Sequence, residues 1–345
     1  MPSLPAGKDG VRLVELDSLR GIAAVSVMLF HLTYFHDELG LAPFQVRWGH
    51  YGVELFFIIS GFVIFMTLAR AKNTREFVVS RVARLYPAYW GAIVLTIAFA
   101  LALEPGHPPF GSTLANFTML QRALGIGDVD GSYWTLVVEL QFYVAIGMLF
   151  HFGDLRRIVP IALVALLIGH AVQLAAKLHW VTLLAGVEFG LFAYGAFFVI
   201  GICLYLLRTP NPPRAVPALL VVAMLYTIWG GPSASHNPDG AVYLPLTVAI
   251  TFIAWLASTG RLVLLRWPVL VWLGGISYPL YLLHLRIGTD VMAALYQRGV
   301  PGAAAVGLAI TLVTLLAWVV HVWIETPARR ALRQALTPRS PPAAA

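Results

Sequence analysis

The chain of 345 residues contains 59% hydrophobic side chains and only 11% charged ones, against about 25% charged in an ordinary soluble domain. Its mean hydropathy is +0.80. These values exclude a soluble enzyme, a disordered chain and a disulfide-bonded scaffold. The formal net charge of +7 is typical of the basic loops that orient membrane proteins, so we do not interpret it as a sign of nucleic-acid binding.

Apolar segments of spanning length follow one another along the whole chain. Because an open strand cannot satisfy its backbone in lipid, each segment is predicted to be a helix. The expected fold is therefore an all-α polytopic integral membrane protein with about ten transmembrane helices. These segments run roughly over 19–36, 52–69, 86–103, 133–152, 158–176, 188–207, 215–231, 241–258, 268–285 and 303–324.

The lysines and arginines predict the orientation of these helices. If the N-terminus is cytoplasmic, 18 of the 23 Lys and Arg residues lie on the inner side, and every inner loop holds at least two. The positive-inside rule then predicts that both termini are cytoplasmic and that the protein crosses the inner (cytoplasmic) membrane many times. We expect one membrane domain over 1–336 and a disordered tail over 337–345.

The first apolar segment contains an arginine and a histidine on one helix face. Arg20 and His31 are 11 residues apart, which is three turns plus 20° and about 16 Å along the axis. This spacing places Arg20 at the cytoplasmic boundary and His31 a little past the middle of the membrane. The alternatives are that Arg20 reaches lipid phosphates and that His31 is an ordinary interior histidine.

Two more arginines precede the third apolar segment. Arg81 and Arg84 are three residues apart, so a helix places them on one face. Such a cationic pair at the inner boundary suits a phosphate group. The alternative is that both arginines serve only membrane topology.

Acidic and histidine side chains lie toward the outer side. Glu139 is about 7–8 Å below Trp134, and a carboxylate at that depth needs a partner or a wet cavity. Glu54 and His284 lie near the outer ends of their segments, where a structural role is also open. Glu325, at the inner boundary, is expected to pair with an inner arginine. The distribution suits an anionic donor that enters from inside and an acceptor reached from outside, and no spacing indicates a metal site.

Several motifs, taken in order, resemble the bacterial membrane acyltransferase family three, which includes O-antigen O-acetyltransferases and macrolide acyltransferases. The resemblance covers about residues 13–333. The motifs are LDSLRGIAAVSVMLFH, GVELFFIISGF, the Arg81/Arg84 stretch before LYPAYW, YWTLVVELQFY, ISYPLYLLH and IETPARR. Many members have a second Glu where this chain has Leu140, so the carboxylate role is assigned to Glu139 alone.

This resemblance implies transfer of an acyl group, commonly acetyl, from acyl-CoA to a hydroxyl of a sugar-containing acceptor. His31 would act as general base, and Glu139 would orient the imidazole or the acceptor. A transient acyl-histidine relay stays open. The negative charges of CoA match the inner arginines, and the remaining polar groups face the acceptor. The implied sites are therefore Arg20, Arg81 and Arg84 for acyl-CoA, and Glu54, Trp134 and His284 for the acceptor.

Two other classes of function remain open from the residues alone. A transporter or flippase for an anionic or glycan substrate would use the same buried charges as a permeation path, although no internal repeat is visible. A non-catalytic membrane partner in envelope assembly is the other class. The acceptor also stays open, with lipopolysaccharide, exopolysaccharide, glycolipid and macrolide sugars all compatible.

Overall fold

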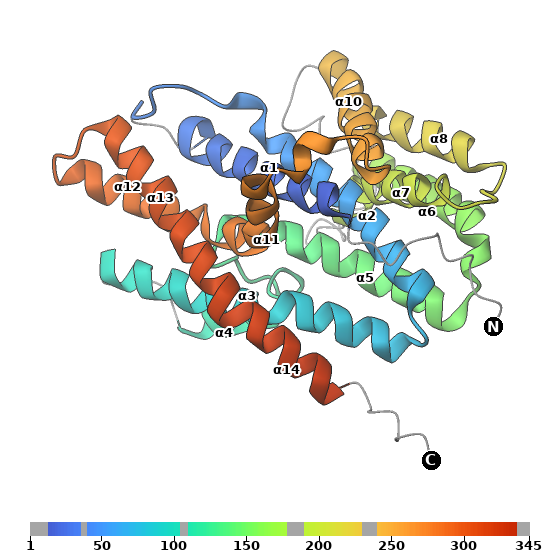
Figure 1. The fold of residues 1–345 in the computed structure, drawn as a ribbon, viewed down its shortest axis with the longest axis horizontal. Helices are drawn as coiled ribbons and strands as arrows, with labels where there is room; N and C mark the ends of the chain where they lie inside the picture. Colours follow the sequence, from blue (N-terminus) through green and yellow to red (C-terminus); the bar gives the residue numbers. More distant parts are fainter. Residues whose placement is uncertain (1–12, 36–39, 104–109, 178–189, 230–239, 337–345) are drawn as a thin grey trace.

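The computed structural model describes residues 13–35, 40–103, 110–177, 190–229 and 240–336 (Figure 1). Throughout these ranges the regular structure is helical, as expected, while the predicted tail 337–345 lies outside them. The α-helices are α1 (Val14–Phe30), α2 (Gly52–Arg70), α3 (Thr74–Leu103), α4 (Phe110–Asn116), α5 (Trp134–Phe152), α6 (Ile158–Lys177), α7 (Gly190–Leu206), α8 (Val216–Trp229), α10 (Gly240–Ser258), α11 (Pro268–Leu283), α12 (Arg286–Gln297), α13 (Gly302–Val320) and α14 (Thr326–Leu336).

Six helical segments within the described ranges are long and apolar enough to cross a membrane. A seventh results if α11 and α12, which meet at a bend of 71°, form one span. The apolar helices α7, α8 and α10 are shorter than a full span in the described residues. The structure thus supports a polytopic membrane protein with six or seven candidate spans, and the ten-span topology stays a prediction.

Helix α1 lies in the middle of the bundle and packs against α11 and α2, while α2 packs against α7 (Figure 1). Glycines allow these close approaches. A Cβ atom on Gly21 would lie 2.6 Å from the Gly274 nitrogen, and one on Gly61 would lie 2.2 Å from the Phe198 oxygen. Small residues at helix crossings are the usual way in which membrane helices approach each other.

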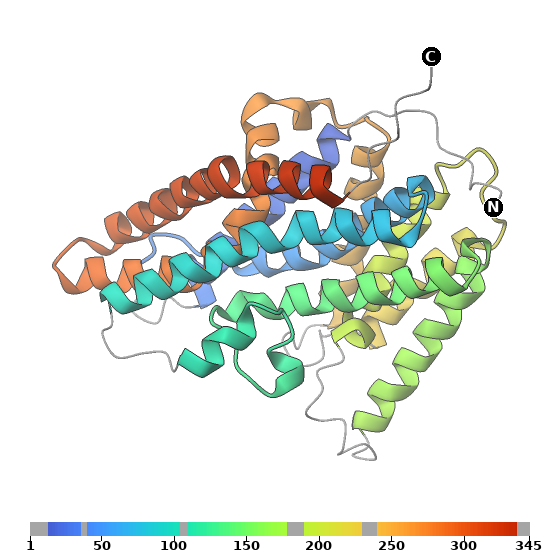
Figure 2. The same ribbon diagram turned by 90° about the horizontal axis from the view of Figure 1, so that it is seen from below.

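The long helix α3 runs beside α5 and beside the α13–α14 arm (Figure 2). It begins at Thr74, well before the apolar segment expected at 86–103. Arg81 and Arg84 therefore lie within one continuous helix. Because they are three residues apart, they are on the same face of it. This arrangement places α14 against α3, and Glu325, just before α14, lies beside Arg84.

Helices α1 and α11 are interrupted at histidines that contact each other, and α13 likewise changes into a π-helix over His321–Glu325. Helix α1 changes into a π-helix over His31–Phe35, and such local widening is frequent at functional sites. Helix α11 ends at Leu283, two residues before the predicted end of the segment 268–285. Helix α12 follows at an angle of 71°. His284 lies at that break. The interruptions of α1 and α11 occur at the same end of this helix pair, because the two rings touch.

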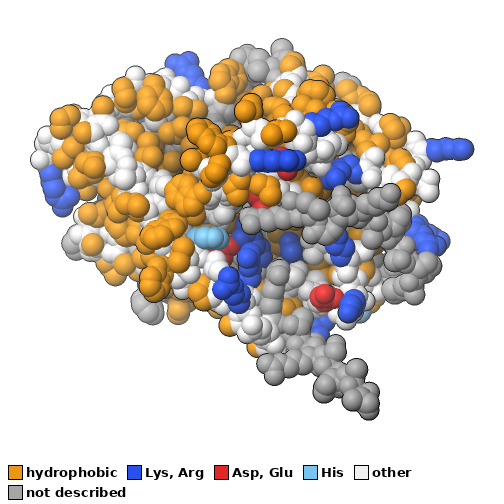
Figure 3. Space-filling model, in the orientation of Figure 1, with side chains coloured by type: hydrophobic (Ala, Val, Ile, Leu, Met, Phe, Trp, Pro, Cys, Tyr) orange, Lys and Arg blue, Asp and Glu red, His pale blue; other side chains and the backbone are white. Residues whose placement is uncertain are grey.

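Hydrophobic side chains cover much of the molecular surface, and Lys and Arg gather mostly in the right half of the view in Figure 3. Large apolar side chains such as Phe152, Leu264 and Trp323 are 73–88% exposed. Exposure on this scale is what lipid contact permits and water disfavours.

Candidate active site

His31 and His284 form a direct contact although they are 253 residues apart in the chain. The His31 Nδ1 atom lies 3.0 Å from the His284 Nε2 atom, and the ring centroids are 5.0 Å apart. His31 is partly buried and His284 is fully buried. The end of α1 and the end of α11 thus bring together two of the residues that the sequence analysis selected, as a pair that it did not predict.

The backbone around His284 is held by a polar network from the segment before α5. The Asp130 carboxylate accepts hydrogen bonds from the backbone nitrogens of Ser132 and Arg286, at 2.8 and 2.9 Å. The Thr135 hydroxyl lies 2.9 Å from the Tyr281 hydroxyl. Asp130 therefore ties the start of α5 to the bend between α11 and α12. Burial raises the pKa of the Asp130 carboxyl, and its hydrogen bonds act in the opposite direction.

A partly open cavity of about 40 Å³ lies between α1, α2, α5 and α11. This volume is room for roughly three water molecules. Arg20 and Glu139 both line it, as does Tyr281. The full lining is Arg20, Val53, Phe56, Phe57, Ser60, Thr135, Leu136, Glu139, Ser277, Tyr278 and Tyr281.

The Glu139 carboxylate has two hydroxyl donors. The Ser60 hydroxyl donates to its Oε1 atom at 2.8 Å, and the Tyr143 hydroxyl donates to the same atom at 2.6 Å. These contacts meet the requirement that an intramembrane carboxylate be paired or hydrated. The direct contact of His31 is with another histidine, so an orienting action of Glu139 on His31 stays a prediction.

Arg20 brings a positive charge to the same cavity. Its Nε atom is buried and has no hydrogen-bond partner among the described residues. Its guanidinium interacts electrostatically with Arg84 and Glu139. A buried donor without an acceptor costs free energy unless a ligand or water satisfies it. Arg20 therefore fits a carbonyl or anionic group that enters the cavity.

Arg84 and Glu325 form an ion pair 241 residues apart in the chain, which confirms that Glu325 pairs with an arginine. The place of this pair at the inner boundary stays a prediction. The other Glu325 oxygen lies 2.8 Å from the Nδ1 atom of His321. Arg81 lies on the same helix, with its guanidinium 5.9 Å from the centre of the Tyr143 ring. The two arginines thus differ, because Glu325 already compensates the charge of Arg84.

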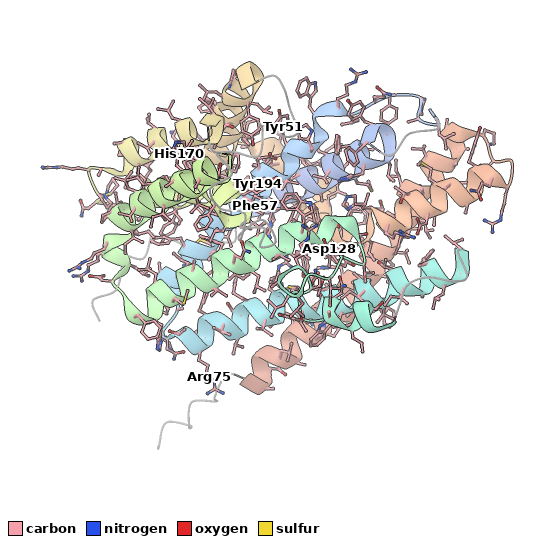
Figure 4. All side chains as sticks on the ribbon, turned by 180° about the vertical axis from the view of Figure 1, so that it is seen from behind. Tyr51, Phe57, Arg75, Asp128, His170 and Tyr194 are labelled. Carbon is pink, nitrogen blue, oxygen red and sulfur yellow. The ribbon has the colours of Figure 1, made fainter. Side chains whose placement is uncertain are left out.

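Glu54 and Trp134 lie beside aromatic side chains. The Tyr243 hydroxyl donates to the Glu54 Oε1 atom at 3.2 Å, and the Oε2 atom of this buried carboxylate has no partner in the described part of the chain. The Trp134 ring lies 5.1 Å from the ring of Tyr194. Tyr194 in turn contacts Phe57 in the interior, whereas Arg75 projects at the lower edge (Figure 4).

Most residues of the site were predicted from the sequence, but the residues that contact them were not. Nothing local in the sequence indicates that His31 meets His284, that Ser60 and Tyr143 reach Glu139, or that Tyr281 lines the cavity. Tyr143 follows Glu139 by four residues, so the helical periodicity of α5 was the one signal that could have revealed this contact. Within the described ranges, three or more His, Cys, Asp or Glu residues nowhere gather in a way that could hold a metal ion.

The fold and the site together define a polytopic helical protein with acid–base groups and arginines buried between its helices. A sequence model described as an acyltransferase domain matches residues 13–323. Since this match covers most of the chain, the protein belongs to this acyltransferase family and is an enzyme. No solved structure matches the chain.

Curated relatives agree with this assignment. The chain is 26% identical over 365 residues to the acyltransferase MdmB of Streptomyces mycarofaciens, covering 93% of both chains. It is 29% identical to the exopolysaccharide production protein ExoZ of Rhizobium meliloti, covering 88% of this chain and 95% of the relative. It is 23% identical to the peptidoglycan O-acetyltransferase OatA of Listeria monocytogenes, covering 92% of this chain but 56% of that longer protein.

Proposed function

We propose that this chain is an O-acyltransferase of the inner (cytoplasmic) membrane, with ten spans and both termini in the cytoplasm. It moves an acyl group, most simply acetyl, from cytoplasmic acyl-CoA to a hydroxyl of a sugar-containing acceptor on the outer side. The names of two relatives support a carbohydrate acceptor, because they refer to exopolysaccharide and to peptidoglycan.

The observation that carries this proposal is the cavity that Arg20 and Glu139 share. Its wall includes Tyr281, whose backbone oxygen lies 2.7 Å from the Nδ1 atom of His284, and His284 contacts His31. One continuous group of residues therefore connects Arg20, whose buried Nε atom has no hydrogen-bond partner among the described residues, to a pair of imidazoles. A thioester carbonyl near Arg20 and a base near the acceptor are what acyl transfer needs.

In the proposed reaction the acceptor oxygen attacks the thioester carbonyl of acyl-CoA. The His31 imidazole takes the hydroxyl proton, because imidazole is the side chain most often used as a general base. The C–S bond then breaks, the sulfur leaves with the electron pair, and a proton completes the CoA thiol. Glu139 orients the acceptor or the base. The buried site limits hydrolysis of the thioester by water.

The donor phosphates are assigned to the inner arginines. Arg81 provides a guanidinium for charge-assisted hydrogen bonds, and Arg84 completes the patch while it keeps its ion pair with Glu325. Arg20 lies deeper, at the cavity. The acceptor is assigned to the side of Glu54 and Trp134, where aromatic rings and a carboxylate provide the mixed lining that small-molecule sites use.

The test is acylation that depends on both the protein and acyl-CoA. The protein in lipid vesicles receives acetyl-CoA labelled in the acetyl group, together with exopolysaccharide, peptidoglycan fragments, glycolipid or a macrolide as acceptor. We expect base-labile label on one acceptor with the wild type and none with His31→Gln. Movement of an unmodified acceptor across the membrane without acyl-CoA would instead support a transporter, and absence of acylation with every acceptor class would overturn the proposal.

The topology has its own test. Single cysteines are introduced within 232–240, expected outside, and near position 339, expected inside. We expect an impermeant thiol reagent to label only the first site in whole cells. Labelling of both sites would contradict ten spans with cytoplasmic termini.

A further inference from the structure

The hydrogen-bond partners of His284 determine which of its nitrogens carries hydrogen. Its Nδ1 atom lies 2.7 Å from the Tyr281 backbone oxygen. A carbonyl oxygen can only accept, so Nδ1 of His284 must donate and carry the hydrogen. In the neutral ring the lone pair is then on Nε2, the atom that faces His31. The ring of His284 is fully buried, so its nitrogens serve protein contacts.

The same reasoning applies to His31. Its Nδ1 atom lies 3.0 Å from the His284 Nε2 atom and 3.0 Å from the Val27 backbone oxygen. Both neighbours are acceptors, so Nδ1 of His31 carries the hydrogen and donates to them. The lone pair of neutral His31 is therefore on Nε2, on the other side of the ring. This is the tautomer in which His31 can receive a proton at Nε2.

We propose that His284 is a positioning residue for His31, and this inference rests on the proposed role of His31 as base. The Nε2 atom of His284 holds the His31 ring and keeps its hydrogen on Nδ1. When His31 takes the acceptor proton at Nε2, it becomes an imidazolium whose Nδ1–H still donates to His284. His284 thus occupies the place of the carboxylate in a serine-hydrolase triad.

A neutral partner suits this location. Burying a carboxylate beside His31 would remove its hydration, which costs several kcal/mol per ion unless other contacts compensate it. A neutral imidazole that already donates to a backbone oxygen needs no counter-charge. The buried Asp130 network and the bend after Leu283 keep His284 in place. His284 was expected at the acceptor site, but its complete burial favours the positioning role instead.

The first test is spectroscopic and independent of activity. The full protein is labelled with ¹⁵N-histidine in lipid nanodiscs, and signals are assigned with His31→Gln and His284→Gln. We expect a ¹⁵N–¹⁵N correlation through the hydrogen bond, between a protonated nitrogen of His31 and an unprotonated nitrogen of His284. A spectrum in which the Nδ1 atom of His31 is unprotonated would overturn the inference, whatever the acyltransferase assay shows.

The second test is kinetic and uses three variants of one residue. His284→Leu removes the acceptor, His284→Asn can replace only Nδ1, and His284→Gln can place an amide oxygen near the position of Nε2. We expect kcat to fall by about 10- to 100-fold in the Leu and Asn variants, less than the roughly 10⁴-fold loss in triads that lose a charged partner. The KM for acetyl-CoA should stay unchanged, and the Gln variant should recover most of the loss.

Three results would contradict the positioning role in well-folded protein. They are normal kcat in the Leu variant, a Gln variant no better than the Leu variant, and a change confined to the KM of the acceptor. The last result would return His284 to acceptor binding. If His31→Gln were itself fully active, the role of His31 as base would fail, while the spectroscopic result on the pair would stand by itself.

Discussion

The two ends of the site satisfy their buried polar groups in different ways. Near α14, Arg84 and His321 both contact Glu325, so a positive charge is matched by a negative one. At the break of α11, His31 and His284 hydrogen-bond as two imidazoles. A buried charge requires a counter-charge, whereas a neutral ring requires only hydrogen bonds. The first arrangement fixes Arg84 by an ion pair, and the second suits the movement of a proton.

The cavity connects these two arrangements. Arg20, which lines it together with Glu139, interacts electrostatically with both Glu139 and Arg84. Tyr281 lines the same cavity, and its backbone oxygen accepts from His284. Donor binding is therefore proposed at the arginine end and proton transfer at the histidine end, so mutations at the two ends should affect different measurements.

The largest effect is expected at the histidine end. His31→Ala should reduce acyl transfer by about 10²–10⁴-fold, the usual contribution of a general base, and leave acyl-CoA binding nearly unchanged. His31→Gln keeps a polar side chain that cannot act as a base, and it should be equally impaired. Rates of transfer from labelled acetyl-CoA and the affinity for acetyl-CoA are measured in the same preparations. Near-normal transfer by the Gln variant would make His31 a structural histidine.

At the charged end the main effect should be on stability. Glu325→Gln leaves the partly buried Arg84 without its counter-charge, and breaking a fully buried pair costs about 3–5 kcal/mol, which is the upper bound here. Thermal unfolding in detergent should show a large decrease in melting temperature. The double variant Arg84→Met/Glu325→Leu removes both charges and should regain much of the loss. A double variant no more stable than Glu325→Gln would show that charge pairing is not what stabilises this end.

The Asp130 network provides an intermediate effect with a defined pH dependence. Asp130→Asn loses the bond from the Arg286 nitrogen, at about 1–3 kcal/mol for a buried polar group left unpaired. Burial raises the pKa of Asp130 above its ordinary 3.8 in the folded protein. Its proton is therefore bound more tightly in the native state, and the wild type gains stability as pH falls through the raised pKa toward 3.8.

Since Asn cannot titrate, the deficit of Asp130→Asn should grow as pH decreases through that range. Melting temperatures of both proteins, recorded across acidic pH, give the difference. Asp154→Asn is the matched control, because Asp154 is an exposed cap on the Arg156 nitrogen that Asn can replace. A deficit of Asp130→Asn that is the same at every pH would contradict the assigned cause.

The smallest effect is expected for single donor arginines. Arg81→Gln should raise the KM for acetyl-CoA about tenfold, roughly the free energy of one charge-assisted hydrogen bond, with kcat nearly unchanged. Arg75→Gln is the control, because Arg75 lies in the first turn of the same helix and is exposed (Figure 4). Equal effects of the two variants would show that Arg81 contributes only general positive charge.

Much of this protein could be predicted from local sequence. Long apolar runs predicted the helices, because burial in lipid depends on composition over about 20 residues. Intrahelical spacing placed Arg81 and Arg84 on one face, and depth along a helix marked Glu139 as a carboxylate in need of partners. The end of the segment 268–285 was predicted to within two residues of Leu283. The 71° turn into α12 was not predicted, since it depends on Asp130 accepting from the Arg286 nitrogen from another part of the chain.

Only the tertiary structure could show which polar groups meet. His31 and His284, and likewise Arg84 and Glu325, are more than 240 residues apart. Their contacts depend on which helices are neighbours, and this depends on close packing such as that of Gly21 against Gly274. Hydropathy is a property of each segment alone, whereas the choice of neighbouring helix depends on the shapes of two surfaces together.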